Sequence, residues 1–317
     1  MSHSHSHSHG HGPCNHSHGH HHAPAEYGRA FIVGLLLNAV FVVAEVYFGF
    51  LSRSMSLLAD AGHNLSDCAG LILAGLAYYL AKRAPTAMFS YGWHAAPIIA
   101  ALLNAMMLVI GTVWIGYEAV TRLVLDGPGD VASGTVMAVA AAGVLVNGLS
   151  ALLFRKGAAH DANLRGAYLH LAADAAVSLG VVISGLVISL TGWNWMDSVT
   201  SLLITVIILR ASWGLLRQTW RMTLQAVPDN IDPVAVYDFL KAQDRVADVH
   251  DLHIWPIGTR DVALSVHLVM PGGHPGDLYL QSLNRLLQEK FAITHAIIQV
   301  ELGDTGMECP YAPAHIL

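Results

Sequence analysis

Two pairs of residues within apolar stretches have the spacing of metal ligands. His63 and Asp67 stand four positions apart in SLLADAGHNLSDCAG, and His170 and Asp174 repeat this spacing in YLHLAADAAVS. Because side chains four positions apart share one face of an α-helix, each pair can present an imidazole and a carboxylate to the same ion. Two such pairs supply four nitrogen and oxygen ligands, a donor set suited to tetrahedral Zn²⁺.

The apolar surroundings of these residues call for an explanation. A charged side chain at the centre of a membrane helix costs about 2.5–3.5 kcal/mol on insertion scales, so each one requires a partner. A lone His or Asp can also serve as a polar contact between helices. The repeated spacing favours the metal site over this alternative. Asp60 shares the face of His63 and Asp67 and is left open between a direct ligand and a helix-entry or gating residue.

The composition identifies the class of protein that contains these pairs. The 317 residues are 54% hydrophobic and only 12% charged, whereas soluble domains carry about 25% charged residues. A membrane protein is therefore expected. The net charge of −6 is spread without acidic or basic blocks, so no nucleic acid partner is expected. The three cysteines are few and far apart, which disfavours disulfides and makes Cys14 and Cys309 better candidates for metal ligands.

Six apolar segments are long enough to span a bilayer. They cover residues 30–51, 56–80, 96–121, 131–154, 165–190 and 197–219. The basic residues between them sort by side: Arg53 and Arg122 on one, and on the other Arg29, Lys82, Arg83, Arg155, Lys156, Arg165, Arg217 and Arg221. This bias places both termini in the cytoplasm. The same limits put His63 in the outer half of its span and His170 in the inner half of its own, a mismatch in depth that the sequence leaves open.

Soluble segments flank the predicted membrane domain of residues 27–222. Residues 1–26 form a low-complexity tail with ten histidines in the first 22 positions, expected to be disordered and cytosolic. A native tail that captures metal is favoured over an expression tag. Residues 223–306 show an α-β-β-α-β pattern that predicts a small α+β domain, ferredoxin-like, with helices on one face of a sheet. Residues 307–317 form a C-terminal tail.

Histidines recur on the predicted strands of this cytosolic domain. His253 and His267 fall on the two strands of a predicted hairpin, where cross-strand neighbours can meet. His295 and Glu301 have the same parity on the last strand and so face one side of the sheet. The alternative is that these are ordinary surface histidines.

Several motifs together resemble the cation diffusion facilitators, and in particular the zinc-exporting members of that family. They run in family order across residues 30–302: SLLADAGHNLSD, FSYGWH at 89–94, the second HxxxD, MDSVTSLLITVIIL at 196–209 and VHDLHIW at 249–255. The expected fold is therefore a multi-pass α-helical membrane protein of six transmembrane helices with a C-terminal cytosolic α+β ferredoxin-like domain.

The resemblance implies a homodimer in the cell (inner) membrane that exports Zn²⁺ in exchange for protons by alternating access. His63, Asp67, His170 and Asp174 match the transport site of the family, and His/Asp pairs resemble its zinc-selective members, with Co²⁺ or Cd²⁺ as further substrates. Dimerisation is expected through the cytosolic domain.

The resemblance also implies that Zn²⁺ is a structural or regulatory ion in the cytosolic domain. His253, His267 and Glu301 fit that pattern, and the weaker candidates are His250, His295 and Cys309. The chain departs from the family after FSYGWH, where Ala95, Ala96 and Pro97 replace the usual Arg-Ala-Glu. His94 is a candidate ligand of an interfacial site there.

Two other classes of function compete with transport. An intramembrane zinc enzyme would need a general base and an open coordination position, as in HExxH, and no such motif occurs. A membrane metal sensor would have no need to strip water from an ion inside the spans, as the paired site requires. We therefore expect a transporter and not an enzyme.

Overall fold

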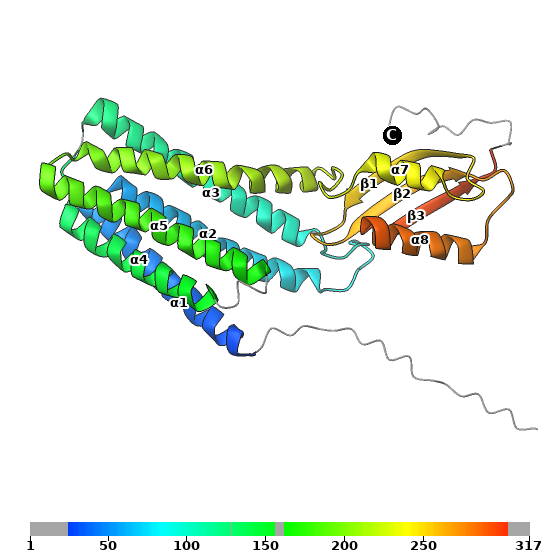
Figure 1. Cartoon of the computed structure of the whole chain (residues 1–317), viewed down its shortest axis with the longest axis horizontal. Coiled ribbons are helices and arrows are strands. Elements are labelled where there is room, and N and C mark those ends of the chain that lie inside the picture. The colour runs from blue at the N-terminus through cyan, green and yellow to red at the C-terminus, as the bar shows by residue number, and fades with distance from the viewer. Residues whose placement is uncertain (1–24, 128, 156–161, 304–317) are drawn as a thin grey trace, which may run out of the picture.

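The computed structural model describes residues 25–127, 129–155 and 162–303, and gives no side-chain positions for the first residues of the first helix. The structure has an elongated helical bundle with a small sheet domain at one end (Figure 1). Cys14, Cys309, the His-rich tail and the predicted C-terminal tail lie outside the described residues.

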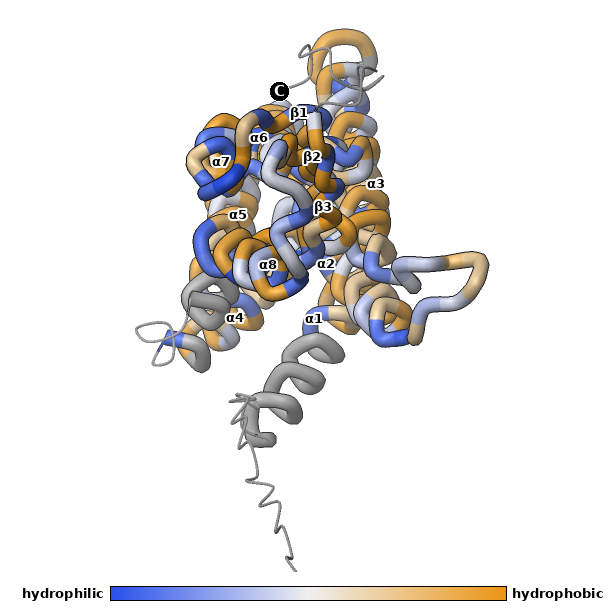
Figure 2. Tube along the Cα trace, turned by 90° about the vertical axis from the view of Figure 1, so that its right-hand side faces the viewer, coloured by the Kyte–Doolittle hydropathy of each residue, from blue (hydrophilic) through white to orange (hydrophobic). Residues whose placement is uncertain are grey.

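Six long helices form the bundle, at the positions predicted from hydropathy. They are α1 (Ala25–Ser52), α2 (Met55–Ala81), α3 (Ala96–Thr121), α4 (Ser133–Arg155), α5 (Ala162–Thr191) and α6 (Trp195–Thr223), with a short π-helical turn η1 (Arg122–Asp126) after α3. Among the described residues, five helices are long and apolar enough to cross a membrane, and the described part of α1 adds the shorter apolar stretch Asn38–Ser52. In Figure 2, where the bundle lies behind the sheet domain, orange, hydrophobic positions recur along the long helices.

The predicted mismatch in depth is resolved by an axial offset between α2 and α5. The Ser178 hydroxyl of α5 donates to Asp60 of α2. Ser178 lies 13 residues before the end of α5, whereas Asp60 lies five residues after the start of α2. Because an α-helix rises about 1.5 Å per residue, α5 extends well beyond α2 at the end of the bundle that lies away from the sheet domain. The offset lets His63 and Asp174 meet although they lie at different depths in their own helices.

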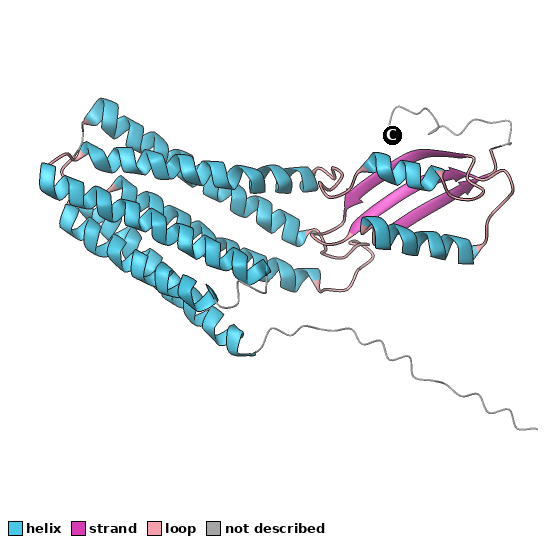
Figure 3. Ribbon diagram, in the orientation of Figure 1, coloured by secondary structure: helices cyan, strands magenta, loops and turns pink. Residues whose placement is uncertain are grey.

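The sheet domain has the predicted α-β-β-α-β order, so the predicted fold class is confirmed. It comprises α7 (Pro233–Lys241), β1 (Asp248–Pro256), β2 (Val262–Val269), α8 (Asp277–Phe291) and β3 (His295–Glu301). The strand order is β1-β2-β3, with β1 and β2 antiparallel and β2 and β3 parallel. Both helices lie on one face of the sheet (Figure 3).

One apolar core holds the sheet domain together. Leu240 of α7, Leu264 and Leu268 of β2, and Leu283 and Leu287 of α8 are almost fully buried in it. Asp232 caps α7, accepting a hydrogen bond from the backbone N–H of Val234, before the proline that begins the helix. β2 is buried or half-buried along its whole length, because it is the central strand and its alternate side chains face the helices.

The core predicts how a small truncation on the sheet will act. Ile254 on β1 is 5% exposed, whereas Ile297 on β3 is 47% exposed. We expect Ile254→Val to destabilise the domain by about 0.5–1.5 kcal/mol because it removes a buried methyl group. Ile297→Val, the matched control, should have a much smaller effect. Thermal unfolding of the detergent-solubilised protein measures both, and equal effects would contradict the packing described here.

Candidate metal centre

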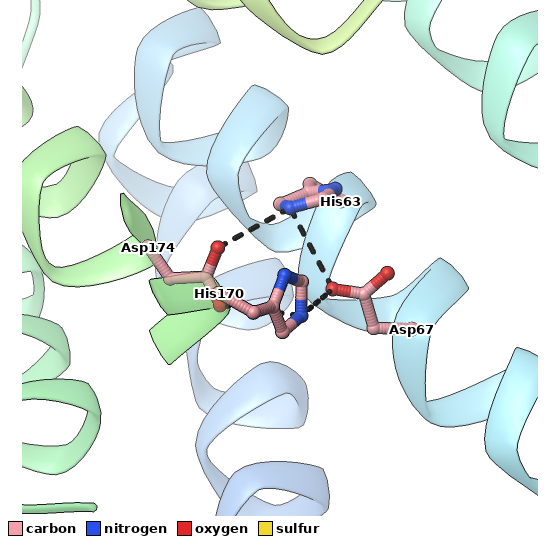
Figure 4. A group of neighbouring side chains, drawn as sticks. All are labelled: His63, Asp67, His170 and Asp174. Carbon is pink, nitrogen blue, oxygen red and sulfur yellow. Dashed lines mark ion pairs between the residues drawn. The ribbon is translucent and has the colours of Figure 1, made fainter. Parts of the chain in front are cut away.

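The two predicted ligand pairs come together across α2 and α5, and each pair occupies one face of its helix (Figure 4). One ligand atom from each of His63, Asp67, His170 and Asp174 lies within 4.8 Å of the others. His170 Nε2 is 3.0 Å from Asp67 Oδ2, and His63 Nε2 is 3.3 Å from Asp174 Oδ1. The shortest contacts therefore join the helices.

The spacing of these atoms suits a tetrahedral ion. Within each helix, His63 Nε2 lies 3.6 Å from Asp67 Oδ2, and His170 Nε2 lies 3.6 Å from Asp174 Oδ2. Zn²⁺ with bonds of about 2.0–2.2 Å to nitrogen and oxygen has ligand atoms about 3.3–3.6 Å apart in a tetrahedron. Two carboxylates would also balance the double charge of the ion.

The four side chains are unequally exposed. The side chain of Asp174 is only 6% exposed, and that of His170 is 50% exposed. His170 precedes Asp174 on α5, and α5 runs from the end of the bundle near the sheet domain toward the far end. The exposed side of the cluster is therefore its side toward the sheet domain.

Hydrogen bonds hold the start of α2 in place at the end of the bundle opposite the sheet domain. Asp197, near the start of α6, accepts hydrogen bonds from the hydroxyls of Ser54 and Ser56 and from the backbone N–H groups of Met55 and Ser56. Asp197 is 2% exposed. This carboxylate satisfies donors at a helix N-terminus, where the helix dipole also favours negative charge.

Asp60 does not join the four-residue cluster. It is fully buried, and its Oδ2 atom accepts a hydrogen bond of 2.7 Å from the Ser178 hydroxyl. Sequence analysis missed Glu45 of α1, which is also fully buried and accepts a hydrogen bond of 3.0 Å from Asn64. An ionisable residue in an apolar span is the signal that could have identified it.

A second cluster lies in the sheet domain, with different members from those favoured by sequence. Ligand atoms of His250, His267 and Glu301 lie within 4.8 Å of one another. Glu301 Oε1 is 2.9 Å from His267 Nδ1, and Glu301 Oε2 is 3.3 Å from His250 Nε2. The cluster thus joins all three strands.

The predicted meeting of His253 and His267 is wrong. His253 lies opposite Ser265, in the same register as the hairpin turn, and the register shift between His250 and His253 places His250 opposite His267. Asp251 in this irregular stretch has a positive φ of 52°. A β-bulge adds one residue to a strand and so changes which residues face the partner strand. His253 instead contacts Asp251, at 3.0 Å.

Two other predicted ligands lie away from both clusters. His295 pairs with Ala263 and Glu301 with Val269, so His295 and Glu301 stand at opposite ends of β3. His295 contacts the ring of Tyr91 in the connection between α2 and α3. His94 Nδ1 lies 3.2 Å from Asp261 Oδ2. A Cβ on Gly258 would lie 2.8 Å from the carbonyl oxygen of His94, so only glycine permits this close approach of the two domains.

The residues of the second cluster fit a zinc ion. His250 Nε2 is buried, and it makes no hydrogen bond within the described part of the chain, although Glu301 Oε2 lies 3.3 Å away. A buried ring nitrogen without a hydrogen bond is costly, and a metal ion between it and Glu301 would satisfy it. Two imidazoles and one carboxylate make a three-ligand set that Zn²⁺ accepts, with a fourth position to be filled.

Both parts of the chain match domains of known proteins. Residues 31–222 match the cation efflux transmembrane domain, and residues 228–302 match the cytoplasmic domain of cation efflux proteins. The chain belongs to the cation efflux family. This membership confirms the resemblance drawn from the motifs, and the expectation of a transporter in place of an enzyme.

Curated relatives of this cation efflux protein align along most of their length. The metal cation efflux system protein CzcD of Cupriavidus metallidurans is 35% identical over 281 residues, covering 88% of each chain. The zinc transporter ZitB of Escherichia coli is 35% identical over 289 residues, covering 90% of this chain and 88% of its own. The cadmium, cobalt and zinc/H⁺-K⁺ antiporter of Bacillus subtilis is 30% identical over 278 residues, covering 86% and 88%.

Proposed function

We propose that this cation efflux protein exports Zn²⁺ from the cytosol in exchange for protons, by alternating access at His63, Asp67, His170 and Asp174. The observation that carries the proposal is the convergence of these four ligands from two membrane helices at the spacing of a tetrahedral ion. Co²⁺ and Cd²⁺ are further candidate substrates, in keeping with the names of relatives.

The donor set also suits exchange with protons. Metal binding requires imidazole in its neutral form and carboxylate in its charged form, so protons and Zn²⁺ compete for the same atoms. Histidine titrates near neutral pH, which allows a modest proton gradient to shift this competition. Protons that reach His63 and His170 from outside would displace the ion, and deprotonation toward the cytosol would restore the ligands.

The exposure of the cluster supports a conformation open toward the cytosol. His170 is half exposed on the side of the sheet domain, whereas Asp197 joins α2 to α6 at the opposite end of the bundle.

The proposed membrane is the cell (inner) membrane, with both termini in the cytoplasm. The sheet domain then lies in the cytosol, where the occupancy of its zinc site would depend on the cytosolic Zn²⁺ concentration.

Transport into proteoliposomes tests the proposal. Vesicles would contain a fluorescent zinc indicator and the purified protein, and a pH gradient would be imposed across the membrane. We expect Zn²⁺ uptake that rises with the proton gradient and stops when an ionophore dissipates it. Zinc movement indifferent to the gradient would refute proton exchange, and the absence of zinc movement would refute transport of zinc itself.

We further propose that the protein is a homodimer joined through its cytosolic domain, with a regulatory Zn²⁺ at His250, His267 and Glu301. The match of residues 228–302 to the family's cytoplasmic domain supports the first part. The grouping of the three ligand atoms supports the second, as does the buried Nε2 atom of His250, which makes no hydrogen bond among the described residues and lies 3.3 Å from Glu301 Oε2. A monomer in cross-linking and light scattering of the solubilised protein would refute the dimer.

The strand register predicts which histidine this regulatory site needs. We expect His250→Ala to lower the number of zinc ions bound per chain by one, because it removes a ligand that faces His267. His253→Ala is the matched control on the same strand and should leave the number unchanged. Equilibrium dialysis with elemental analysis measures both. An unchanged number in His250→Ala, or a loss in His253→Ala, would contradict the assignment.

A further inference from the structure

Glu45 of α1 and Asp60 of α2 form a pair of buried acids that the metal centre does not use. Both side chains have zero exposure, and the two carboxyl groups interact with each other. No hydrogen bond or ion pair joins either one to His63, Asp67, His170 or Asp174 in the part of the chain that the structure describes. The pair is therefore a separate group of titratable side chains.

Each acid has one satisfied and one unsatisfied oxygen. Glu45 Oε2 accepts a hydrogen bond from the Asn64 amide, and Asp60 Oδ2 accepts one from the Ser178 hydroxyl. Glu45 Oε1 and Asp60 Oδ1 are buried and have no partner among the described residues. Leaving such oxygens unpaired in a buried site is unfavourable. One proton between the two carboxyl groups would supply the missing donor.

The charges around the pair also favour a bound proton. The titratable groups that face it are Asp174 on α5 and His63 on α2, and no Lys or Arg interacts with either acid among the described residues. Charged groups on other helices have partners or positions of their own. Asp197 accepts hydrogen bonds at the start of α2, Glu118 pairs with Arg122, and Arg155 is the last residue of α4. Ionising two buried carboxylates together is costly when no cation is near, which favours a proton on the pair while the metal centre is empty.

The pair has a defined place relative to the metal centre. Asp60 precedes His63 by three residues on α2, and Ser178 follows Asp174 by four residues on α5. Both steps lead toward the end of the bundle where Ser54 bonds to Asp197, away from the sheet domain. The pair thus lies about one helical turn beyond the metal ligands, on the side toward which the ion would leave.

We propose that Glu45 and Asp60 together hold one proton and carry it through the transport cycle, as a proton-binding site distinct from the metal ligands. This inference rests on the proposed exchange of Zn²⁺ for protons. The pair alternates between one shared proton, with a net charge of −1, and none, with a net charge of −2. The proton enters from the outside and leaves toward the cytosol, and only an O–H bond is made and broken.

Infrared spectroscopy of the zinc-free protein in lipid, together with proton and zinc fluxes in proteoliposomes, tests this proposal. Glu45→Gln and Asp60→Asn keep the shape of each side chain and supply an amide donor to the remaining acid. We expect the carbonyl band of a protonated carboxylic acid in the wild type, and its loss in both variants. The number of protons exchanged per Zn²⁺ should fall by one in each variant. Equilibrium zinc binding should stay close to that of the wild type, since all four ligands remain.

Glu118→Gln on α3 is the matched control, because it makes the same chemical change at an acid outside the pair. It should leave both the infrared band and the proton count unchanged. A band that persists in both pair variants would overturn the proposal, as would a lost band with an unchanged proton count. A zinc ion in the wild type beyond those at the transport and regulatory sites, if it disappears in Glu45→Gln, would also overturn the proposal, since the pair would then bind metal. Failure of the wild type to transport would refute the proposed function alone, and the infrared band would still decide whether the pair holds a proton.

Discussion

Replacing Asp174 by alanine is expected to reduce zinc transport at least about 100-fold, because loss of a mere supporting residue already costs about 10–100-fold in metal affinity or activity. Asp174 is the most buried of the four proposed ligands, and its oxygens face both histidines, at 3.3 Å from His63 and 3.6 Å from His170. Its removal leaves three ligands and half of the compensating charge. Initial rates of zinc uptake into proteoliposomes at matched protein content measure the effect.

A control variant separates the loss of a ligand from a general effect of removing an acid. Asp130 lies in the exposed connection before α4, where its only described contact is a hydrogen bond of 3.4 Å from Asn194. Asp130→Ala should transport zinc like the wild type. Asp174→Ala should also elute as a folded protein, since its partners are the other ligands. Transport by Asp174→Ala at the rate of Asp130→Ala would show that the four-residue cluster is not the transport site.

Replacing Asp197 by alanine is expected to give the largest loss of stability among the substitutions considered. Asp197 accepts hydrogen bonds from two hydroxyls and two backbone N–H groups, all buried at the start of α2. Each buried donor left without an acceptor costs about 1–3 kcal/mol. The start of α2 would also lose the negative charge that its dipole favours. Thermal unfolding in detergent measures the change.

Asp197→Asn provides the graded comparison for this prediction. The amide keeps one oxygen as an acceptor and loses the charge, so the variant should fall between the wild type and Asp197→Ala. Asp130→Ala again serves as the control for an exposed acid and should unfold at the wild-type temperature. Equal stability of Asp197→Ala and the wild type would mean that water or another group replaces the carboxylate at no cost.

The helices and the first cluster could be predicted because their signals are local. Hydropathy marks each span directly, and the two HxxxD spacings depend only on helical periodicity, so both ligand pairs could be found without long-range information. The axial offset that brings His63 to the depth of Asp174 depends on how α2 and α5 pack and could not. Glu45 carries the local signal of an acid in an apolar span, but its neighbours Asp60 and Asn64 lie on another helix, so its pairing could not be predicted from its own segment. Its partner became visible only when α1 and α2 were packed together.

The second cluster shows a different limit of sequence reasoning. Alternation along the strands correctly placed β1 and β2, but it does not fix the register of the hairpin. From the turn the ladder pairs His253 with Ser265, and if it continued unbroken it would bring Asp251 opposite His267. The irregularity at Asp251 moves the register by one position and brings His250 there instead. A bulge depends on how a strand fits its neighbour and leaves little mark on hydropathy. The identity of a cross-strand pair was therefore beyond what the pattern could determine.

Because the four proposed ligands are divided between two helices, a movement of one helix relative to the other would change the site. α5 packs most extensively against α4, whereas α2 packs against α3 and, through Asp197, is tied to α6. The cluster therefore straddles a seam between two groups of helices, and α2 and α5 touch only sparingly along it. A slip of one helical turn moves one group by about 5.4 Å relative to the other, which exceeds every ligand contact in the cluster. If the four side chains bind Zn²⁺ as proposed, such a slip would separate the ligands of α2 from those of α5, so the site would bind the ion at one alignment of the two groups and release it at the next.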